Sequence, residues 1–184
     1  MSQDSHCDRH GPDVSAICGT PAGGTGFSTG LGFDAHRFSP RQDRPLWLAC
    51  LEWDGEGPGL DGDSDGDVAA HALVDAVLSA ADLGDIGSLF GVGRDSRGAG
   101  MHGGDMLREV CGLISARGFR LGKASVVLVA SRPHLDSRRE EARKAMSLAV
   151  GGPVSLTATT TDGMGFTGRG EGVAAIASAL LVTT

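Results

Sequence analysis

Apolar residues recur with the period of a helix along three stretches of the chain, and the most regular stretch follows Asp67. Its apolar positions are spaced three or four residues apart, as on one face of a helix. These positions are Val68, Ala72, Leu73, Ala76, Val77 and Ala80. Ser64 and Asp67 have the spacing of a capping box, with Asp where Glu or Gln is usual. The pattern predicts a helix that begins between Ser64 and Asp67 and turns an apolar face toward a core.

Two more helices are expected, at residues 105–117 and 137–150. The first has apolar residues at helical spacing and Gly118 as its C-terminal stop. The second is amphipathic and strongly charged, and it ends at a pair of glycines. Residues 91–104 are rich in glycine and lack periodicity, which predicts a mobile loop.

Five apolar or β-branched stretches between turn residues have the character of strands. They cover residues 29–38, 45–52, 124–130, 154–161 and 173–182. Trp47, in the second of these strands, is expected to pack on the core. The order of elements is two strands, two helices, a strand, a helix and two strands, which predicts an α+β fold. We expect a mostly antiparallel or mixed sheet with the helices packed on one face, as a two-layer sandwich.

Composition narrows the class of protein. The chain has 184 residues, which favours one domain with a core of its own. A net charge of −7 argues against a broad nucleic-acid-binding surface. No run of apolar residues is long enough for a membrane span, so no membrane partner is expected. The four cysteines are scattered without CxxC spacing, which favours a cytoplasmic location.

Residues 1–28 are polar and lack periodicity, so we expect a disordered leader ahead of a catalytic domain at residues 29–184. The leader has neither the apolar run of a secretory signal nor the acid-poor composition of a transit peptide. It contains histidines and cysteines that suggest zinc, but their spacing fits no closed site. These residues are His6, Cys7, His10 and Cys18.

Candidate chemistry begins on the first helix. Asp67, His71 and Asp75 are four residues apart, so their side chains are expected to stack on one face. An imidazole flanked by two carboxylates is a common way to orient a metal-binding histidine, which makes Asp67 and Asp75 candidate supports of His71. A solvated acidic face with one incidental histidine would give the same pattern.

Asp34 and His36 are two residues apart in the first strand, so both side chains are expected on the same face. An exposed edge strand could carry such a pair by chance. Together with His71 the pair would supply three oxygen and nitrogen ligands and leave a fourth position open. That arrangement is typical of a catalytic zinc site rather than a structural one.

A second candidate cluster lies at residues 159–172, where three threonines precede a glycine-rich turn. Hydroxyls and backbone N–H groups at such a turn can hold phosphate oxygens. The alternative is a threonine-rich sheet edge with a flexible hairpin. Asp85, in another glycine-punctuated turn, could accept a substrate hydroxyl or could simply be a turn residue.

Four motifs occur in a fixed order: D-x-H at residues 34–36, SDGDVxxHALxDA at 64–76, LGDIG at 83–87 and TTTxxxGFTGRGEG at 159–172. This ordered set resembles the 2-C-methyl-D-erythritol 2,4-cyclodiphosphate synthase family of the non-mevalonate isoprenoid pathway, over residues 29–184. The resemblance implies an α+β homotrimer with active sites between adjacent subunits. It implies a phosphorus–oxygen lyase that cyclises 4-diphosphocytidyl-2-C-methyl-D-erythritol 2-phosphate and releases CMP.

The resemblance also implies roles for individual residues. Asp34, His36 and His71 would bind one zinc ion per site and lie against the substrate. Thr160 would polarise a phosphate in the transition state. Asp162 stands where a Glu usually holds a magnesium or manganese ion on the diphosphate. The remaining substrate contacts would come from Ser64, Asp85, Gly87, His134 and Thr159, and Phe166 and Arg169 match residues of an axial cavity that accepts isoprenoid diphosphates.

Several positions depart from the family pattern. Asp63 replaces a histidine that can hydrogen-bond a phosphate, so we assign it, with Thr160, to the catalytic group. Gly91–Arg94 stand where the family has an acidic PDTD, and His134 and Gly163 each stand where lysine is usual. These departures leave two alternatives open. One is a diverged homologue that acts on a different nucleoside-diphosphate conjugate, and the other is a non-catalytic trimer that binds metal and nucleotide.

Overall fold

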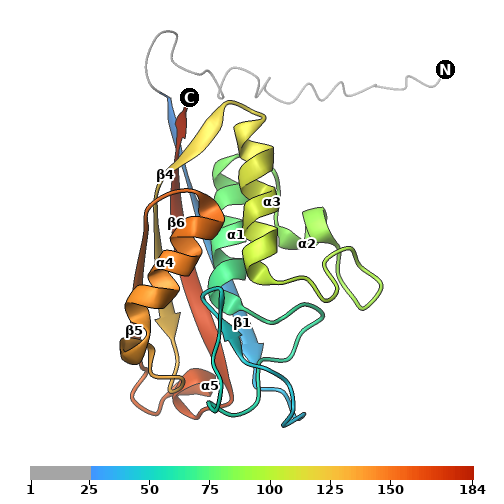
Figure 1. The fold of residues 1–184 in the computed structure, drawn as a ribbon, viewed down its shortest axis with the longest axis vertical. Coiled ribbons are helices and arrows are strands. Elements are labelled where there is room, and N and C mark those ends of the chain that lie inside the picture. Colours follow the sequence, from blue (N-terminus) through green and yellow to red (C-terminus); the bar gives the residue numbers. More distant parts are fainter. Residues whose placement is uncertain (1–25) are drawn as a thin grey trace, which may run out of the picture.

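The structure is a computed structural model that describes residues 26–184, and its centre is a four-stranded sheet (Figure 1). The strands are β1 (Phe27–Arg37), β4 (Phe119–Val129), β5 (Val154–Thr159) and β6 (Gly172–Thr183). Their order across the sheet is β1-β6-β4-β5. β6 is antiparallel to both β1 and β4, whereas β4 and β5 are parallel. The expected mixed α+β fold is confirmed.

Three long helices, α1 (Val68–Ala80), α3 (Gly103–Ser115) and α4 (Arg139–Val150), lie on one side of the sheet in Figure 1. The shorter elements are β2 (Trp47–Leu48), β3 (Leu51–Glu52), α2 (Ile86–Phe90), α5 (Gly165–Gly168) and the 3₁₀ turn η2 (Leu135–Ser137). α1 is the central helix: nearly all its residues are buried, because it contacts β1 and β6 as well as α3.

The close contact between α1 and β1 depends on two glycines. A Cβ on Gly30 would lie 2.2 Å from the carbonyl oxygen of Ala76, and one on Gly32 would lie 2.0 Å from that of Ala72. Any side chain at these positions would therefore push the helix away from the strand. Because side chains alternate along a strand, Asp34 lies on the same face, next to α1. The glycines thus place Asp34 close enough to reach His71.

The predicted helix α1 is confirmed, but its cap differs from the prediction. The cap is Asp67, whose carboxylate accepts hydrogen bonds from the backbone N–H groups of Ala69 and Ala70. The hydroxyl of Ser64 lies beside His71 instead. A carboxylate at this position also interacts favourably with the partial positive charge at the helix N-terminus.

The prediction of a single strand at residues 45–52 is wrong, because β2 and β3 form a tight hairpin there. The turn residues Ala49 and Cys50 have φ values of 55° and 62°, and their N–H groups donate to the carboxylate of Asp67. Trp47 is only partly buried and packs against His102 with the two rings tilted, whereas Trp53 lies in the core. A buried acceptor far away in the sequence bends this segment, which local pattern could not reveal.

Two strands are longer than expected. β4 begins at Phe119 rather than at residue 124, because pairing with β6 continues past its glycine and charged residues. β1 begins at Phe27 and pairs there with Val182, so the end of the expected leader belongs to the sheet. The rest of that leader, with its histidines and cysteines, lies outside the described residues. The expected loop at residues 91–104 is irregular, and its last residues begin α3.

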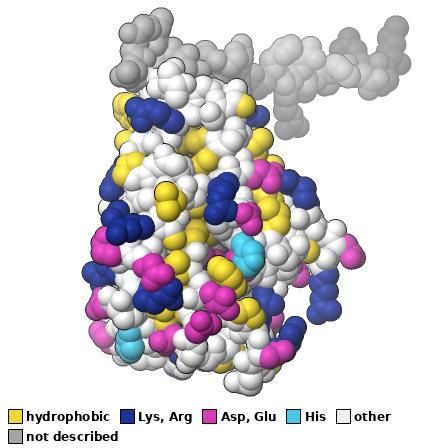
Figure 2. All heavy atoms as spheres, viewed as in Figure 1, with side chains coloured by type: hydrophobic (Ala, Val, Ile, Leu, Met, Phe, Trp, Pro, Cys, Tyr) yellow, Lys and Arg dark blue, Asp and Glu magenta, His cyan; other side chains and the backbone are white. Residues whose placement is uncertain are grey.

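Among residues 26–184, no helix packs on the second face of the sheet, which we call the outer sheet face. It exposes Phe27, Leu31, Phe33 and Ile176, with 74%, 72%, 60% and 48% of their surfaces accessible. Phe33 and Ile176 are direct partners in the β1–β6 register, so their side chains lie side by side. On the helix-covered face, acidic and basic side chains are instead interspersed (Figure 2). Within residues 26–184, no helix is long and apolar enough to span a bilayer.

Candidate active site

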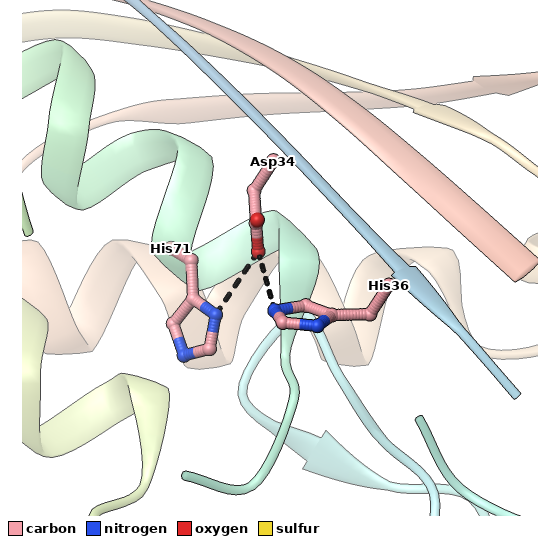
Figure 3. A group of neighbouring side chains, drawn as sticks. All are labelled: Asp34, His36 and His71. Carbon is pink, nitrogen blue, oxygen red and sulfur yellow. Dashed lines mark hydrogen bonds and ion pairs between the residues drawn. The ribbon is translucent and has the colours of Figure 1, made fainter. Parts of the chain in front are cut away.

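Three side chains converge where β1 meets the first turns of α1 (Figure 3). Asp34 Oδ2 lies 3.0 Å from His71 Nδ1 and 3.2 Å from His36 Nε2. One ligand atom of each residue lies within 4.8 Å of the other two. We call this group the metal triad. Two imidazole nitrogens and one carboxylate oxygen suit a divalent transition metal and leave room for a further ligand, so the residues fit the predicted metal.

Burial and charge act against each other in the triad. Burial alone would raise the pKa of Asp34, but hydrogen bonds from His36 and His71 outweigh it and hold this pKa far below its usual range. Burial likewise opposes charge on His71, yet its bond to Asp34 and the surrounding carboxylates raise its pKa above the ordinary value of 6.5. The site therefore favours positive charge at its centre, as expected of a site that binds a cation.

The other nitrogen of His71 faces a different carboxylate from those predicted. Its Nε2 lies 3.2 Å from Ser64 Oγ and 3.6 Å from Asp65 Oδ1. Asp67 instead caps α1, and Asp75 accepts a hydrogen bond of 2.7 Å from the backbone N–H of Ile86. The assignment of Asp67 and Asp75 as direct supports of His71 is therefore corrected. Helical spacing correctly placed both residues near His71 on α1, but their carboxylates accept hydrogen bonds from backbone N–H groups instead.

Two clefts meet at the metal triad. A cleft of about 200 Å³ contains all three triad residues, together with Ser64, Gly87 and the wall formed by residues 90–98. A larger, open cleft of about 740 Å³ lies beyond His36. Its basic lining consists of Arg37, Arg41, Arg44 and Arg94.

The sequence analysis did not find this group of arginines. Arg44 also donates to the carbonyl oxygens of Gly62 and Ser64, and so supports the segment before α1. The lysines that the family pattern leads one to expect at residues 134 and 163 are absent here, but four arginines line the cleft beside the triad. Arg37 pairs with Asp61 and Arg41 with Asp43. Only the fold brings Arg94 next to the residues near 41–44, so sequence spacing offered little signal.

The threonine turn, residues 159–171, begins at the β5 edge of the sheet and returns to β1, where the carbonyl oxygen of Glu171 accepts a hydrogen bond of 2.9 Å from the N–H of Phe38. Thr159 ends β5, and the side chains of Thr160 and Asp162 are exposed and hydrogen-bonded to each other at 3.0 Å. β1 and β5 are opposite edges of the sheet. Three inter-strand spacings of about 4.8 Å separate them by roughly 14 Å. Neither cleft at the metal triad includes a residue of the threonine turn.

Comparison with known proteins identifies the family. Residues 27–182 match the YgbB family. The 2-C-methyl-D-erythritol 2,4-cyclodiphosphate synthase of Bifidobacterium longum is 56% identical over 170 residues, which are 86% of this chain and 98% of that relative. This chain belongs to the 2-C-methyl-D-erythritol 2,4-cyclodiphosphate synthase family.

Solved structures agree with this family assignment. A bifunctional IspDF from Campylobacter jejuni has a TM-score of 0.80 and 33% identity, covering 88% of this chain and 43% of its own. A 2C-methyl-D-erythritol-2,4-cyclodiphosphate synthase in a CDP-bound form has a TM-score of 0.73 and 39% identity. That alignment covers 83% of this chain and 99% of the synthase. The shared fold therefore extends over nearly the whole described chain.

Asp63, where the synthase family usually has histidine, holds a neighbouring loop in this structure. Its carboxylate accepts a hydrogen bond of 2.9 Å from the N–H of Gly93, and its carbonyl accepts one from Gly100. Asp63 lines both clefts, so it remains beside the triad. The contact fixes residues 91–100 as a wall of the smaller cleft.

The remaining family positions are more dispersed. Asp85 caps α2 by accepting a hydrogen bond from the N–H of Ser88, while Gly87 lines the smaller cleft. His134 is exposed at the start of η2. Phe166 is 41% exposed, and Arg169 pairs with a glutamate two residues later at 2.7 Å.

Proposed function

We propose that this chain is a metal-dependent phosphorus–oxygen lyase that cyclises 4-diphosphocytidyl-2-C-methyl-D-erythritol 2-phosphate to 2-C-methyl-D-erythritol 2,4-cyclodiphosphate and releases CMP. The main observation is a complete metal triad at a cleft, in a chain 56% identical to a synthase of this name. The similarity to a CDP-bound synthase supports a nucleotide-linked substrate.

In the proposed reaction an oxygen of the 2-phosphate forms a bond with the β phosphorus, and the bond from that phosphorus to CMP breaks. The attacking oxygen is already anionic, so no strong general base is needed. The difficulty is to hold two anions together and to support the leaving CMP, which makes positioning and charge neutralisation the main catalytic contributions. A zinc ion bound at the triad would supply Lewis-acid stabilisation of the phosphate charge.

The protein residues around the triad have separate roles in this proposal. Asp34, His36 and His71 hold the metal. Ser64 donates to a phosphate oxygen and Gly87 contacts the erythritol, since both line the smaller cleft. The arginine-lined cleft beside His36 would hold the diphosphate and balance the negative charge of Asp63. In this arrangement the chain could carry out the same reaction although Asp63 stands where the family has histidine.

We propose that the active site is completed by a second subunit of a homotrimer. Thr159 and Thr160 begin their turn at the β5 edge, across the sheet from the triad of their own chain. The exposed outer sheet face supplies an apolar surface through which copies of the chain could associate. Thr159 and Thr160 of one subunit would then meet nucleotide and diphosphate held at the triad of the next. Asp162 would carry a magnesium or manganese ion on that diphosphate.

Two finer proposals follow from the family resemblance. Phe166 and Arg169 would line a cavity on the trimer axis and accept an isoprenoid diphosphate. His134, from the turn before α4, would approach the nucleotide. All three residues have exposed side chains, as such contacts require.

Phosphorus NMR tests the proposed function directly. We expect zinc- and magnesium-loaded protein to convert the cytidine diphosphate-linked substrate into the cyclic diphosphate and CMP. His36→Ala, tested in parallel, should produce neither. Folded, zinc-loaded protein that gives no cyclic product would overturn the proposal, and faster turnover of a different nucleotide conjugate would favour the diverged homologue.

A further inference from the structure

The carboxylate of Asp65, which has no part in the proposed reaction, lies near the His71 ring nitrogen that faces away from the metal triad. His71 Nδ1 faces Asp34 and the rest of the metal triad, whereas its Nε2 faces Ser64 Oγ at 3.2 Å and Asp65 Oδ1 at 3.6 Å. Only 5% of the side-chain surface of His71, and 5% of that of Asp65, is accessible. A negative charge in this buried place is costly unless neighbouring donors stabilise it.

The Asp65 carboxylate has such donors on both oxygens. Oδ1 accepts a hydrogen bond of 3.0 Å from the N–H of Asp67, and Oδ2 accepts one of 2.8 Å from the N–H of Gly103. Oδ2 also lies 3.3 Å from His102 Nδ1. The indole of Trp47 packs against the His102 ring at an interplanar angle of 55°, with the ring centroids 4.4 Å apart. The carboxylate is therefore fixed between the starts of α1 and α3.

A histidine can bind a metal only through an unprotonated nitrogen, and the other nitrogen then carries the hydrogen. Carboxylates next to that second nitrogen commonly select this tautomer and the ring orientation. We propose that Asp65 is the positioning residue of the metal triad: with Ser64 Oγ, it keeps the hydrogen on Nε2 of His71 and leaves Nδ1 free for the metal. This inference rests on the proposed function for the metal, but not on turnover of any substrate.

The same arrangement determines what Ser64 can do. If Nε2 carries a hydrogen, Ser64 Oγ accepts it, and the serine's own hydrogen is free to point elsewhere. Ser64 lines the smaller cleft beside the triad. Its hydroxyl would then be available as a donor to an anion in that cleft. Asp65 thus links the metal ligand to the substrate-facing hydroxyl through His71.

A purely structural role for Asp65 is the competing explanation, since it also joins α1 to α3. The two roles differ in one measurable respect. A structural residue lowers the stability of the metal-free protein, but it leaves the zinc affinity of the folded protein unchanged. A positioning residue changes that affinity and the environment of the His71 N–H. Asp75→Asn is the matched control, because Asp75 lies on the same helix and bonds Ile86 rather than His71.

The experiment compares wild type, Asp65→Asn and Asp75→Asn by chelator competition for zinc. We expect the zinc affinity of Asp65→Asn to fall by about 10- to 100-fold, the usual cost of losing such a partner. Asp75→Asn should bind zinc as wild type does. In ¹⁵N-resolved NMR of the zinc-loaded wild type, the Nε2–H of His71 should be protected from exchange. Asp65→Asn should lose that protection.

Unchanged zinc affinity and unchanged Nε2–H protection in Asp65→Asn would overturn the proposal. If Asp65→Asn does not fold, His102→Gln decides the question. His102 is half exposed and lies 3.3 Å from Asp65 Oδ2, so this substitution weakens the positioning of Asp65 without changing a buried residue. A loss of zinc affinity in His102→Gln supports the proposal, and no loss overturns it. A wild type that binds zinc but does not turn over the substrate would overturn only the proposed function.

Discussion

The metal triad and the threonine turn are both candidate parts of one active site, but they are built differently. Asp34 and His71 lie in a well-packed region, where two glycines bring strand and helix together and the ligands hydrogen-bond one another. Thr160 and Asp162 lie on an exposed turn and bond mainly to each other. One region is pre-organised within a single chain, and the other presents its groups outward.

This difference indicates that the metal triad is complete within one chain, whereas the threonine turn is not. Binding groups that are already desolvated and oriented lose little on binding a ligand, which suits a metal. Exposed groups such as Thr160, where the turn leaves the opposite edge of the sheet, would bind a ligand more tightly once a second surface approaches them. The comparison therefore predicts that the triad functions within one chain and that the threonine turn functions with its neighbour.

The largest effect is expected from His36→Ala, which removes a triad ligand whose side chain is partly exposed. Zinc content should fall to a small fraction of one per chain, and turnover should fall by about a thousandfold or more, because the charge stabilisation is lost. Metal analysis and phosphorus NMR measure the two quantities. Full zinc content with normal turnover would contradict the assignment of the triad.

A mixing experiment sharpens the comparison further. Thr160→Val should lower turnover by about 100-fold, the usual cost of one lost donor to a transition-state charge. When Thr160→Val and His36→Ala chains are refolded together, about a quarter of the sites in random trimers should combine an intact triad with an intact Thr160. Recovered activity near that level is expected in the assay. If the mixture is no more active than its components, the site does not combine these two regions from different chains.

The outer sheet face provides the third test. Phe33→Asp should dissociate the proposed trimer, since each buried phenylalanine contributes about 2 kcal/mol to association and a buried carboxylate adds a further cost. Sedimentation velocity measures the change. Leu148→Asp is the control, because Leu148 is 82% exposed on α4, on the helix-covered face. Equal behaviour of the two variants would exclude this face as the interface.

The smallest effect concerns the metal-free protein and pH. The pKa of His71 in the folded protein is raised because its bond to Asp34 and nearby carboxylates outweigh its burial. Its stabilising contribution is therefore fully present below about pH 6.5, the unfolded value, and is lost as pH rises through the folded pKa. We expect a lower melting temperature at pH 9 than at pH 6, and a smaller difference in Asp34→Asn. A melting temperature that is higher at pH 9 than at pH 6 in the wild type, but not in Asp34→Asn, would contradict the predicted direction.

Much of the fold and the three triad residues could be predicted from local patterns. The period of α1, the alternation of β1 and the D-x-H spacing each depend on neighbours in the sequence, and the structure brings Asp34, His36 and His71 together as expected. The choice of supporting carboxylate could not be predicted in the same way. Asp65, Asp67 and Asp75 are similar in sequence, and which of them faces His71 depends on where the N–H groups of distant segments lie.

The amino-acid sequence by itself determined the α+β elements and the three residues of a candidate metal site, because periodicity and spacing are properties of the local backbone. The tertiary structure decided three further matters: the hairpin bent by Asp67, the arginines gathered beside His36, and the separation of Thr159 and Thr160 from the triad. Each depends on contacts between segments that are far apart in the chain. Such contacts follow from packing and strand order, which no local pattern specifies.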